Sequence, residues 1–207
     1  MPLVLAKRVS KLKEKNKYYP YLWVIEMNNP SNEVKSAGTL GLVGVILMLV
    51  GLIPYAGVLS IVGLILVLIA LNRLSRAYGN DAIWRNALYG FVMGIVGAVV
   101  LVVAVFAYLM PMLSLHVPPM IASPYGFGTS LLVFFVVLFI IAYVFSILEF
   151  RFFRNAYREL AGSSGVEDFN KAARWYWIGA LSLIVLVGAV LILIGHIYAL
   201  LGYNKLR

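Results

Sequence analysis

Cysteine is missing from all 207 residues, and charged side chains are scarce. Without cysteine, the chain forms no disulfide, has no thiolate nucleophile and offers no Cys-ligated metal or cluster site. Charged residues make up 12% of the chain, apolar residues make up 63%, and the mean hydropathy is +0.95. So few polar groups do not cover the surface of a soluble domain. The composition therefore predicts an all-α integral membrane protein.

The few charges are mostly positive. Seventeen Lys and Arg against eight Asp and Glu give a formal charge of +9. The basic residues flank the apolar runs and do not form a stripe on a nucleic-acid-binding fold, so nucleic acid is not an expected partner. Anionic lipid headgroups are the expected partner, because they attract basic segments next to a membrane span.

Apolar runs that match the thickness of a bilayer recur along the chain. About 20 helical residues cross a hydrocarbon core of about 30 Å. We expect five transmembrane helices, with the spans at about residues 36–53, 54–71, 87–109, 129–148 and inside a last helix at 166–203. The Pro54–Gly57 corner makes the first two helices a short antiparallel hairpin. Length favours two full spans there, although a re-entrant hairpin has the same charge pattern.

The last two helices are expected to be longer than the membrane is thick. The helical pattern of the fourth continues from Glu149 to Leu160 and is expected to end at Gly162. Ser164 and Glu167 have the spacing of a capping box that opens the last helix. A continuous helix over 166–203 would be about 57 Å long. The two helices are then expected to form a long hairpin that protrudes beyond the inner face.

Lys and Arg placement predicts the orientation. Of the 17, only Lys205 and Arg207 follow the last span, and the others fall in the N-terminal arm and in two loops on its side. The positive-inside rule then places the N-terminus inside and the C-terminus outside. Residues 1–35 are expected to form a basic, aromatic cytoplasmic and interfacial arm, and residues 36–207 the transmembrane domain of a plasma-membrane protein. The residues expected at lipid headgroups are Lys7, Arg8, Lys11, Lys15, Trp23, Trp175 and Trp177.

Glycine is the residue type with the clearest pattern inside the spans. Small residues let helix backbones approach closely, and packing drives helix association in lipid. These glycines are expected to pack the helices of one chain together, or to form a face that docks a second copy or another membrane subunit. The candidate packing residues are Gly38, Gly41, Gly44, Gly90, Gly94, Gly97, Gly188, Gly195 and Gly202.

Groups able to perform chemistry are few. The expected spans contain no Lys, Arg, Asp or Glu at membrane depth, and such groups are what ion-coupled transport usually needs. His116 lies in the expected outer loop and His196 near the outer end of the last span. Two histidines without a nearby carboxylate are fewer ligands than a metal site usually has. We therefore expect no catalysis, no cofactor and no metal.

Several segments carry a resemblance to a known family. They are 37–41 (AGTLG), 53–57 (IPYAG), 63–70, 86–90 (NALYG) and 169–180, which ends in WIGA. The chain resembles the uncharacterised archaeal and bacterial membrane proteins that share domain of unknown function 996, over roughly residues 36–203. The resemblance implies a multi-pass membrane protein and supplies no catalytic residues.

Two functions agree with these patterns. The first is a structural or accessory subunit that self-associates or packs into a larger membrane assembly. The second is a channel or facilitator for a small neutral solute or lipid. A polar path lined by Ser60, Thr129, Ser130 and Ser146 would favour the second, and a tightly packed interior would disfavour it.

Overall fold

The computed structural model describes residues 30–53, 55–113 and 124–207, and the regular structure in them is helical. The helices are α3 (Pro30–Val50), α4 (Gly57–Tyr78), α5 (Asp81–Leu113), α6 (Pro124–Ser164), α7 (Glu167–Ser182), the 3-10 turn η1 (Leu183–Val185) and α8 (Gly188–Lys205). Five of them, α3, α4, α5, α6 and α8, are long and apolar enough to cross a membrane. The predicted all-α class and the number of potential spans are confirmed.

The corners between the helices on the charged side are shorter than the sequence suggests. Residues 72–86, between the second and third expected spans, are mostly helical, and only Gly79 and Asn80 separate α4 from α5. Gly79 takes a left-handed φ of 63° and ends α4. Gly162 does not end α6, which continues to Ser164. Gly165, with a φ of 71°, makes that corner instead.

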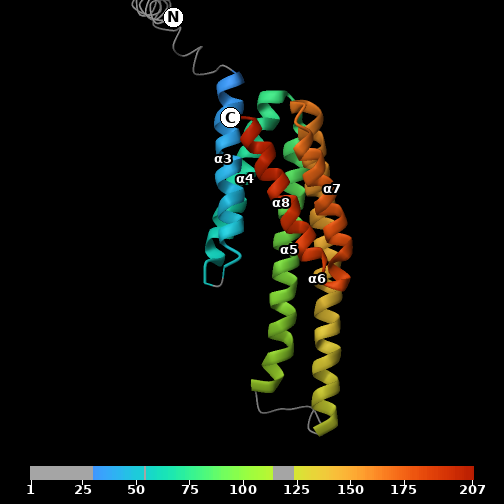
Figure 1. Ribbon diagram of the computed structural model, residues 1–207. Coiled ribbons are helices and arrows are strands. Elements are labelled where there is room, and N and C mark those ends of the chain that lie inside the picture. The colour runs from blue at the N-terminus through green and yellow to red at the C-terminus, as the bar shows by residue number, and fades with distance from the viewer. Residues whose placement is uncertain (1–29, 54, 114–123) are drawn as a thin grey trace, which may run out of the picture.

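The last segment folds back on itself, so the expected continuous helix over 166–203 is wrong. α7 ends at Ser182, and Leu186 takes a left-handed φ of 61° before α8 begins. α8 then returns beside α7 (Figure 1). A Cβ built on Gly179 would lie 3.0 Å from the carbonyl oxygen of Gly188, so the two backbones are in close contact. No local pattern in the sequence shows this contact.

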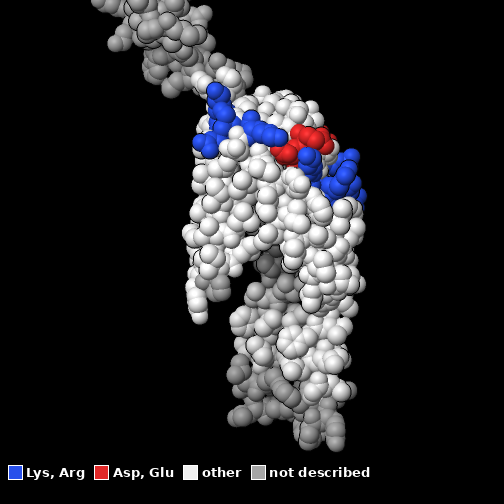
Figure 2. Space-filling model, in the orientation of Figure 1, with Lys and Arg blue, Asp and Glu red and all other residues white. Residues whose placement is uncertain are grey.

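The reversal also overturns the predicted placement of the C-terminus on the opposite side from the N-terminal arm. Lys205 Nζ lies 2.6 Å from Asp168 Oδ2 at the start of α7. A Cβ on Gly38, near the start of α3, would lie 2.9 Å from the Cβ of Leu206. The C-terminus and the start of α3 are therefore at one end of the bundle, where the Lys, Arg, Asp and Glu of the visible face also gather (Figures 1 and 2).

At the charged end, the α6–α7 corner is tied to the neighbouring α4–α5 corner, because Asn80 donates hydrogen bonds to Glu159 (3.2 Å) and Ser163 (3.0 Å) on α6. Whether this end protrudes beyond the membrane face stays a prediction. The hairpin that extends alone is α5–α6, at its other end. α3–α4 and α7–α8 turn back well before α5 and α6 end (Figure 1).

The core lies at the charged end of the bundle. Its largest buried side chains include Tyr203, Phe169, Leu71 and Leu74. Tyr157 of α6 lies among the rings of Phe169 and Tyr203, with ring centroids 6.0 and 6.3 Å away. The contacts join α6, α7 and α8 into one packed unit, and Leu206 joins that unit to α3.

Candidate functional site

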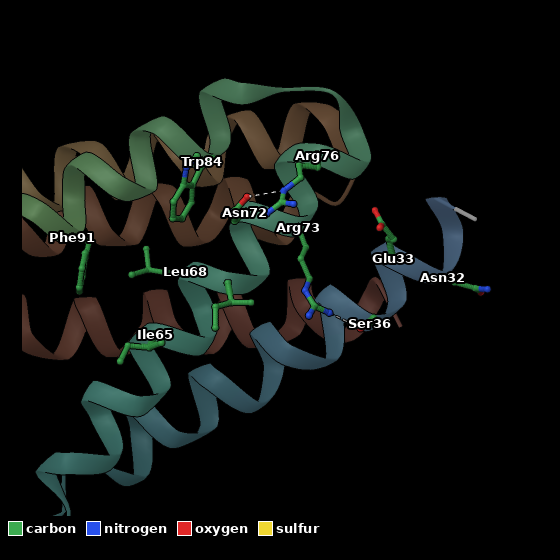
Figure 3. Close-up of a pocket in the computed structure, with 11 residues that line it drawn as sticks. Asn32, Glu33, Ser36, Ile65, Leu68, Asn72, Arg73, Arg76, Trp84 and Phe91 are labelled. Carbon is green, nitrogen blue, oxygen red and sulfur yellow. Dashed lines mark hydrogen bonds between the residues drawn. The ribbon is translucent and has the colours of Figure 1, made fainter. Parts of the chain in front are cut away.

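A groove at the charged end of the bundle, between α3, α4 and α5, has a volume of about 970 Å³. It forms because α4 and α5 diverge from their two-residue corner while α3 stays packed along α4 (Figure 3). The close α3–α4 contact depends on two facing glycines: a Cβ on Gly44 would lie 2.7 Å from the carbonyl oxygen of Gly63. The walls of the groove are therefore two helices in tight contact and a third that leaves them.

One end of the groove is polar and cationic. Arg73 and Arg76 are one helical turn apart on α4 and line it together. Arg73 Nη1 donates a hydrogen bond to Ser36 Oγ on α3 (3.2 Å), and Arg76 Nε donates one to Asn72 Oδ1 (3.0 Å). The one acidic lining residue, Glu33, comes from the first turn of α3. The bonds orient both guanidinium groups along the groove wall (Figure 3).

The other end of the groove is apolar. Ile65, Leu68 and Ile69 line it from α4, and Trp84 and Phe91 project into it from α5 (Figure 3). Ile65 and Ile69 are 45% and 41% exposed, so the apolar part is open along its length. The groove therefore changes from a charged opening to an apolar trough within a few helical turns.

A second, smaller hollow of about 100 Å³ lies inside the bundle and is lined by residues that include Glu149 and His196. His196 Nδ1 lies 2.9 Å from the carbonyl oxygen of Ile192, and its ring stands edge-on to Tyr176 at 5.1 Å. The Glu149 carboxyl group lies against α5, where a Cβ on Gly94 would be 3.1 Å from its carboxyl carbon. The sequence did not indicate that Glu149 and His196 line the same hollow. His116, considered together with His196 as a possible metal ligand, lies outside the described residues.

The nine candidate packing glycines all face atoms of the same chain. Five of them face aromatic rings from neighbouring helices: Gly41 with Tyr203, Gly90 with Phe153, Gly97 with Phe145, Gly195 with Tyr176 and Gly202 with Phe169. The contacts of the other four are Gly38 with Leu206, Gly44 with Gly63 and Val67, Gly94 with Glu149, and Gly188 with Gly179 and Leu183. These contacts are intramolecular packing, and none of them requires a second copy.

Of the residues expected at lipid headgroups, Trp175 and Trp177 lie half-buried on α7. The guanidinium carbon of Arg154 lies 5.0 Å from the ring centroid of Trp177, which is within cation–π range. Lys7, Arg8, Lys11, Lys15 and Trp23 lie outside the described residues.

The polar residues expected along a solute path do not converge on one. Ser60 donates a hydrogen bond to the Met48 carbonyl oxygen inside the α3–α4 hairpin (3.1 Å). Thr129 bonds to the Gly126 carbonyl oxygen (3.2 Å), and Ser130 lies 3.4 Å from the hydroxyl of Tyr108. Both belong to the first turns of α6, at the end that α3–α4 does not reach (Figure 1).

Sequence reasoning missed the groove residues. Arg73 and Arg76 count in the sequence only as charges that orient the chain. Their position on one helical face beside Asn72 is visible from the spacing, but the divergence of α4 and α5 that opens the groove is not. Within the described part of the chain, no three His, Asp or Glu side chains lie close enough together to hold a metal ion.

Comparison with known proteins identifies relatives of unknown function. The chain is 31% identical over 179 residues to the uncharacterized protein MJ1644 of Methanocaldococcus jannaschii, which covers 84% of this chain and 93% of that protein. No solved structure matches the chain. Residues 59–197 match the family described as "Protein of unknown function (DUF996)". The match covers more than half of the chain, from the first turn of α4 into α8, so the chain belongs to the DUF996 family.

Proposed function

We propose that this protein is a non-catalytic component of the plasma membrane, an accessory subunit that self-associates or packs into a larger membrane assembly. The observation that carries the proposal is the position of two helix turns. The α3–α4 and α7–α8 hairpins end in apolar turns beside the middle of α5–α6, where α5 and α6 continue as apolar helices (Figure 1).

The composition of the turns supports this role. Leu52 and Ile53 at the first turn are 65% and 59% exposed, and Leu186 at the second is 76% exposed. An all-apolar turn of this kind is suited to hydrocarbon and not to water. Bonds such as Leu52 N–H to the Leu49 carbonyl (3.2 Å) and Leu186 N–H to the Leu183 carbonyl (3.0 Å) hold the backbone of these turns. Irregular backbone at membrane depth is tolerated where protein or a water-filled cavity covers it. A neighbouring subunit would supply that cover.

The shape of the molecule supports the same role. Below the tip of the α3–α4 hairpin the surface steps inward toward α5–α6 (Figure 2). The far part of α5–α6 is the least covered part of the bundle, with side chains such as Val103 (60%) and Phe135 (59%) exposed. In an assembly, the step beneath the short hairpins is the place where a second chain fits beside α5–α6.

Purification in native-lipid nanodiscs, followed by mass photometry, tests the proposal. A stoichiometric complex is expected, and Leu186→Trp should reduce its fraction because a bulky ring no longer fits under the partner. Val43→Trp, on the exposed side of α3, is the matched control and should leave the complex intact. A monomer at all protein concentrations, or equal behaviour of the two variants, would contradict the proposal.

A second candidate is a facilitator for a lipid or a small neutral solute, and the open groove between α3, α4 and α5 favours it. Reconstitution into vesicles distinguishes the two functions, because a facilitator accelerates the movement of a labelled lipid or solute between leaflets or compartments. A subunit with a structural role leaves that rate at the level of protein-free vesicles.

A further inference from the structure

The groove between α3, α4 and α5 has the two properties that an amphiphile requires of a site. Its polar end carries fixed positive charge, and its apolar end is open along the side of α4 (Figure 3). Its volume of about 970 Å³ is at the upper end of the range for small-molecule sites. Space, charge and an apolar wall occur together in the same place.

The charge at the polar end is available to an anion. Ion pairs within the described residues involve Asp168, with Lys171 and Lys205, and neither Arg73 nor Arg76 takes part in them. Each of the two guanidinium groups bonds instead to a neutral oxygen, of Ser36 or Asn72. A guanidinium has five N–H donors, so each group retains donors beyond the one used.

The chemistry of the polar end favours a phosphate group. A planar guanidinium matches the oxygens of a phosphate with two parallel hydrogen bonds, and two guanidinium groups one turn apart present a wider set of donors. Glu33 is the one carboxylate in the lining, and Figure 3 shows it near the start of α3. Two cations against one anion leave the lining with a net positive charge.

The apolar end identifies the rest of the ligand. A free inorganic anion gains no binding free energy from contact with Ile65, Leu68 and Phe91, whereas a hydrocarbon chain contacts such side chains favourably. Ile65 and Ile69 remain exposed, so a chain reaches the trough sideways from the bilayer without crossing a barrier of protein. Trp84, which lies between the polar and apolar ends, is a residue type that prefers the headgroup level.

Charge also argues against the N-terminal segment of this chain as the occupant. Residues 1–29 contain six Lys and Arg and two acidic residues, Glu14 and Glu26. A segment with that balance is repelled by the two arginines. A lipid with a phosphate headgroup is attracted by them, and the surrounding membrane supplies it.

We propose that the groove between α3, α4 and α5 binds one anionic phospholipid, with the headgroup phosphate at Arg73 and Arg76 and a hydrocarbon chain along Ile65, Leu68 and Phe91. The proposal goes beyond the assembly role and does not depend on it, since the groove lies within a single chain. It also differs from general attraction of the basic end to the membrane, because it assigns one lipid to one site.

Native mass spectrometry of the full-length protein, with phosphatidylglycerol or phosphatidylcholine added in detergent, measures this binding. One phosphatidylglycerol is expected to stay bound. The double substitution Arg73→Gln and Arg76→Gln should weaken its binding about tenfold or more, as expected when charge-assisted hydrogen bonds are removed. The matched control is Arg85→Gln with Arg158→Gln, which removes the same charge from exposed positions outside the groove. Equal weakening in the two double variants would overturn the site.

A second variant keeps the test decisive if the double substitution prevents folding. Ile69→Trp retains both guanidinium groups and fills the apolar trough, so it should weaken phosphatidylglycerol binding while the melting temperature is retained. Inorganic phosphate is the other arm of the experiment. If phosphate alone displaces the lipid at millimolar concentration and Ile69→Trp has no effect, the groove is a simple anion site and the lipid proposal is wrong.

Discussion

The two ends of the α5–α6 hairpin differ in charge and in their surroundings. At the charged end, α5 packs on α6 beside the other hairpins, and Gly90 lies against the ring of Phe153. At the far end, α5 and α6 contact each other and little else. The most apolar segment of the α6 span, with a mean hydropathy of 3.1, is 0% buried, whereas the corresponding segment of α8, with a value of 1.2, is 28% buried.

High hydropathy therefore marks the lipid-facing surface of the protein and not its core. Lipid tails are as apolar as leucine, so apolar side chains gain little by leaving them. The core is built instead from rings seated on glycines, as with Tyr203 on Gly41 and Phe169 on Gly202.

The largest effect is an all-or-none difference in labelling between the two ends. Single substitutions Asn204→Cys and Arg85→Cys should react with a membrane-impermeant maleimide from the same side of sealed vesicles. Thr129→Cys, near the start of α6, should not react from that side. The natural absence of cysteine makes the background clean. Reaction of Asn204→Cys from the opposite side to Arg85→Cys would show that α7 and α8 form one continuous span.

Removing a ring should matter at one end only. Tyr203 is fully buried and Phe135 is 59% exposed. Truncation of a buried aromatic side chain typically costs about 3–5 kcal/mol, so Tyr203→Ala should lower the free energy of unfolding by that order. Phe135→Ala should change it by less than about 0.5 kcal/mol, as surface substitutions do. Thermal unfolding in one detergent measures both, and equal losses would refute the comparison.

Adding a methyl group should have the same asymmetry. A Cβ on Gly41 would overlap the ring of Tyr203, while a Cβ on Gly128 would meet nothing within 4 Å. Gly41→Ala should therefore destabilise the protein by about 1–3 kcal/mol through overpacking. Gly128→Ala should be neutral or stabilise by up to about 1 kcal/mol, because alanine loses less backbone freedom in a helix. A stable Gly41→Ala protein would mean that Tyr203 does not sit on α3.

The smallest effect is at the corner that ties the α4–α5 turn to α6. Asn80→Ala removes the hydrogen bonds to Glu159 and Ser163, and the one that Asn80 Oδ1 accepts from Ala82 N–H, and should cost about 1 kcal/mol. Asn170→Ala is the control, since the bond of Asn170 to Glu167 is exposed and joins residues three positions apart. Hydrogen exchange at the α4–α5 corner should increase in the first variant and stay unchanged in the second.

Much of the fold could be predicted from the sequence, because runs of apolar residues of the right length are a local signal. The corner near Pro54 and the close packing at Gly90 and Gly94 were also visible as patterns. The reversal at Leu183–Val187 was not, because the run around it contains no charge and no proline. The reversal brings Gly179 against Gly188, a contact between two helices that exists only after the chain has turned.

The candidate groove was hidden for a related reason. Arg73 and Arg76 have the same sequence signal as any basic residue at the end of a span, and that signal concerns orientation. The two arginines become groove residues because of the space beside them, and that space depends on the angle between α4 and α5. Angles between helices are set by packing of side chains far apart in the sequence, so a local pattern does not contain them.

The contact of Leu206 with Gly38 places the penultimate residue of the chain against the first described helix. Because a ribosome adds residues from the N-terminus onward, α3 is completed long before the side chain that covers it is synthesised. Until residue 206 has been synthesised, the glycine face of α3 therefore depends on lipid or on a helper protein for cover.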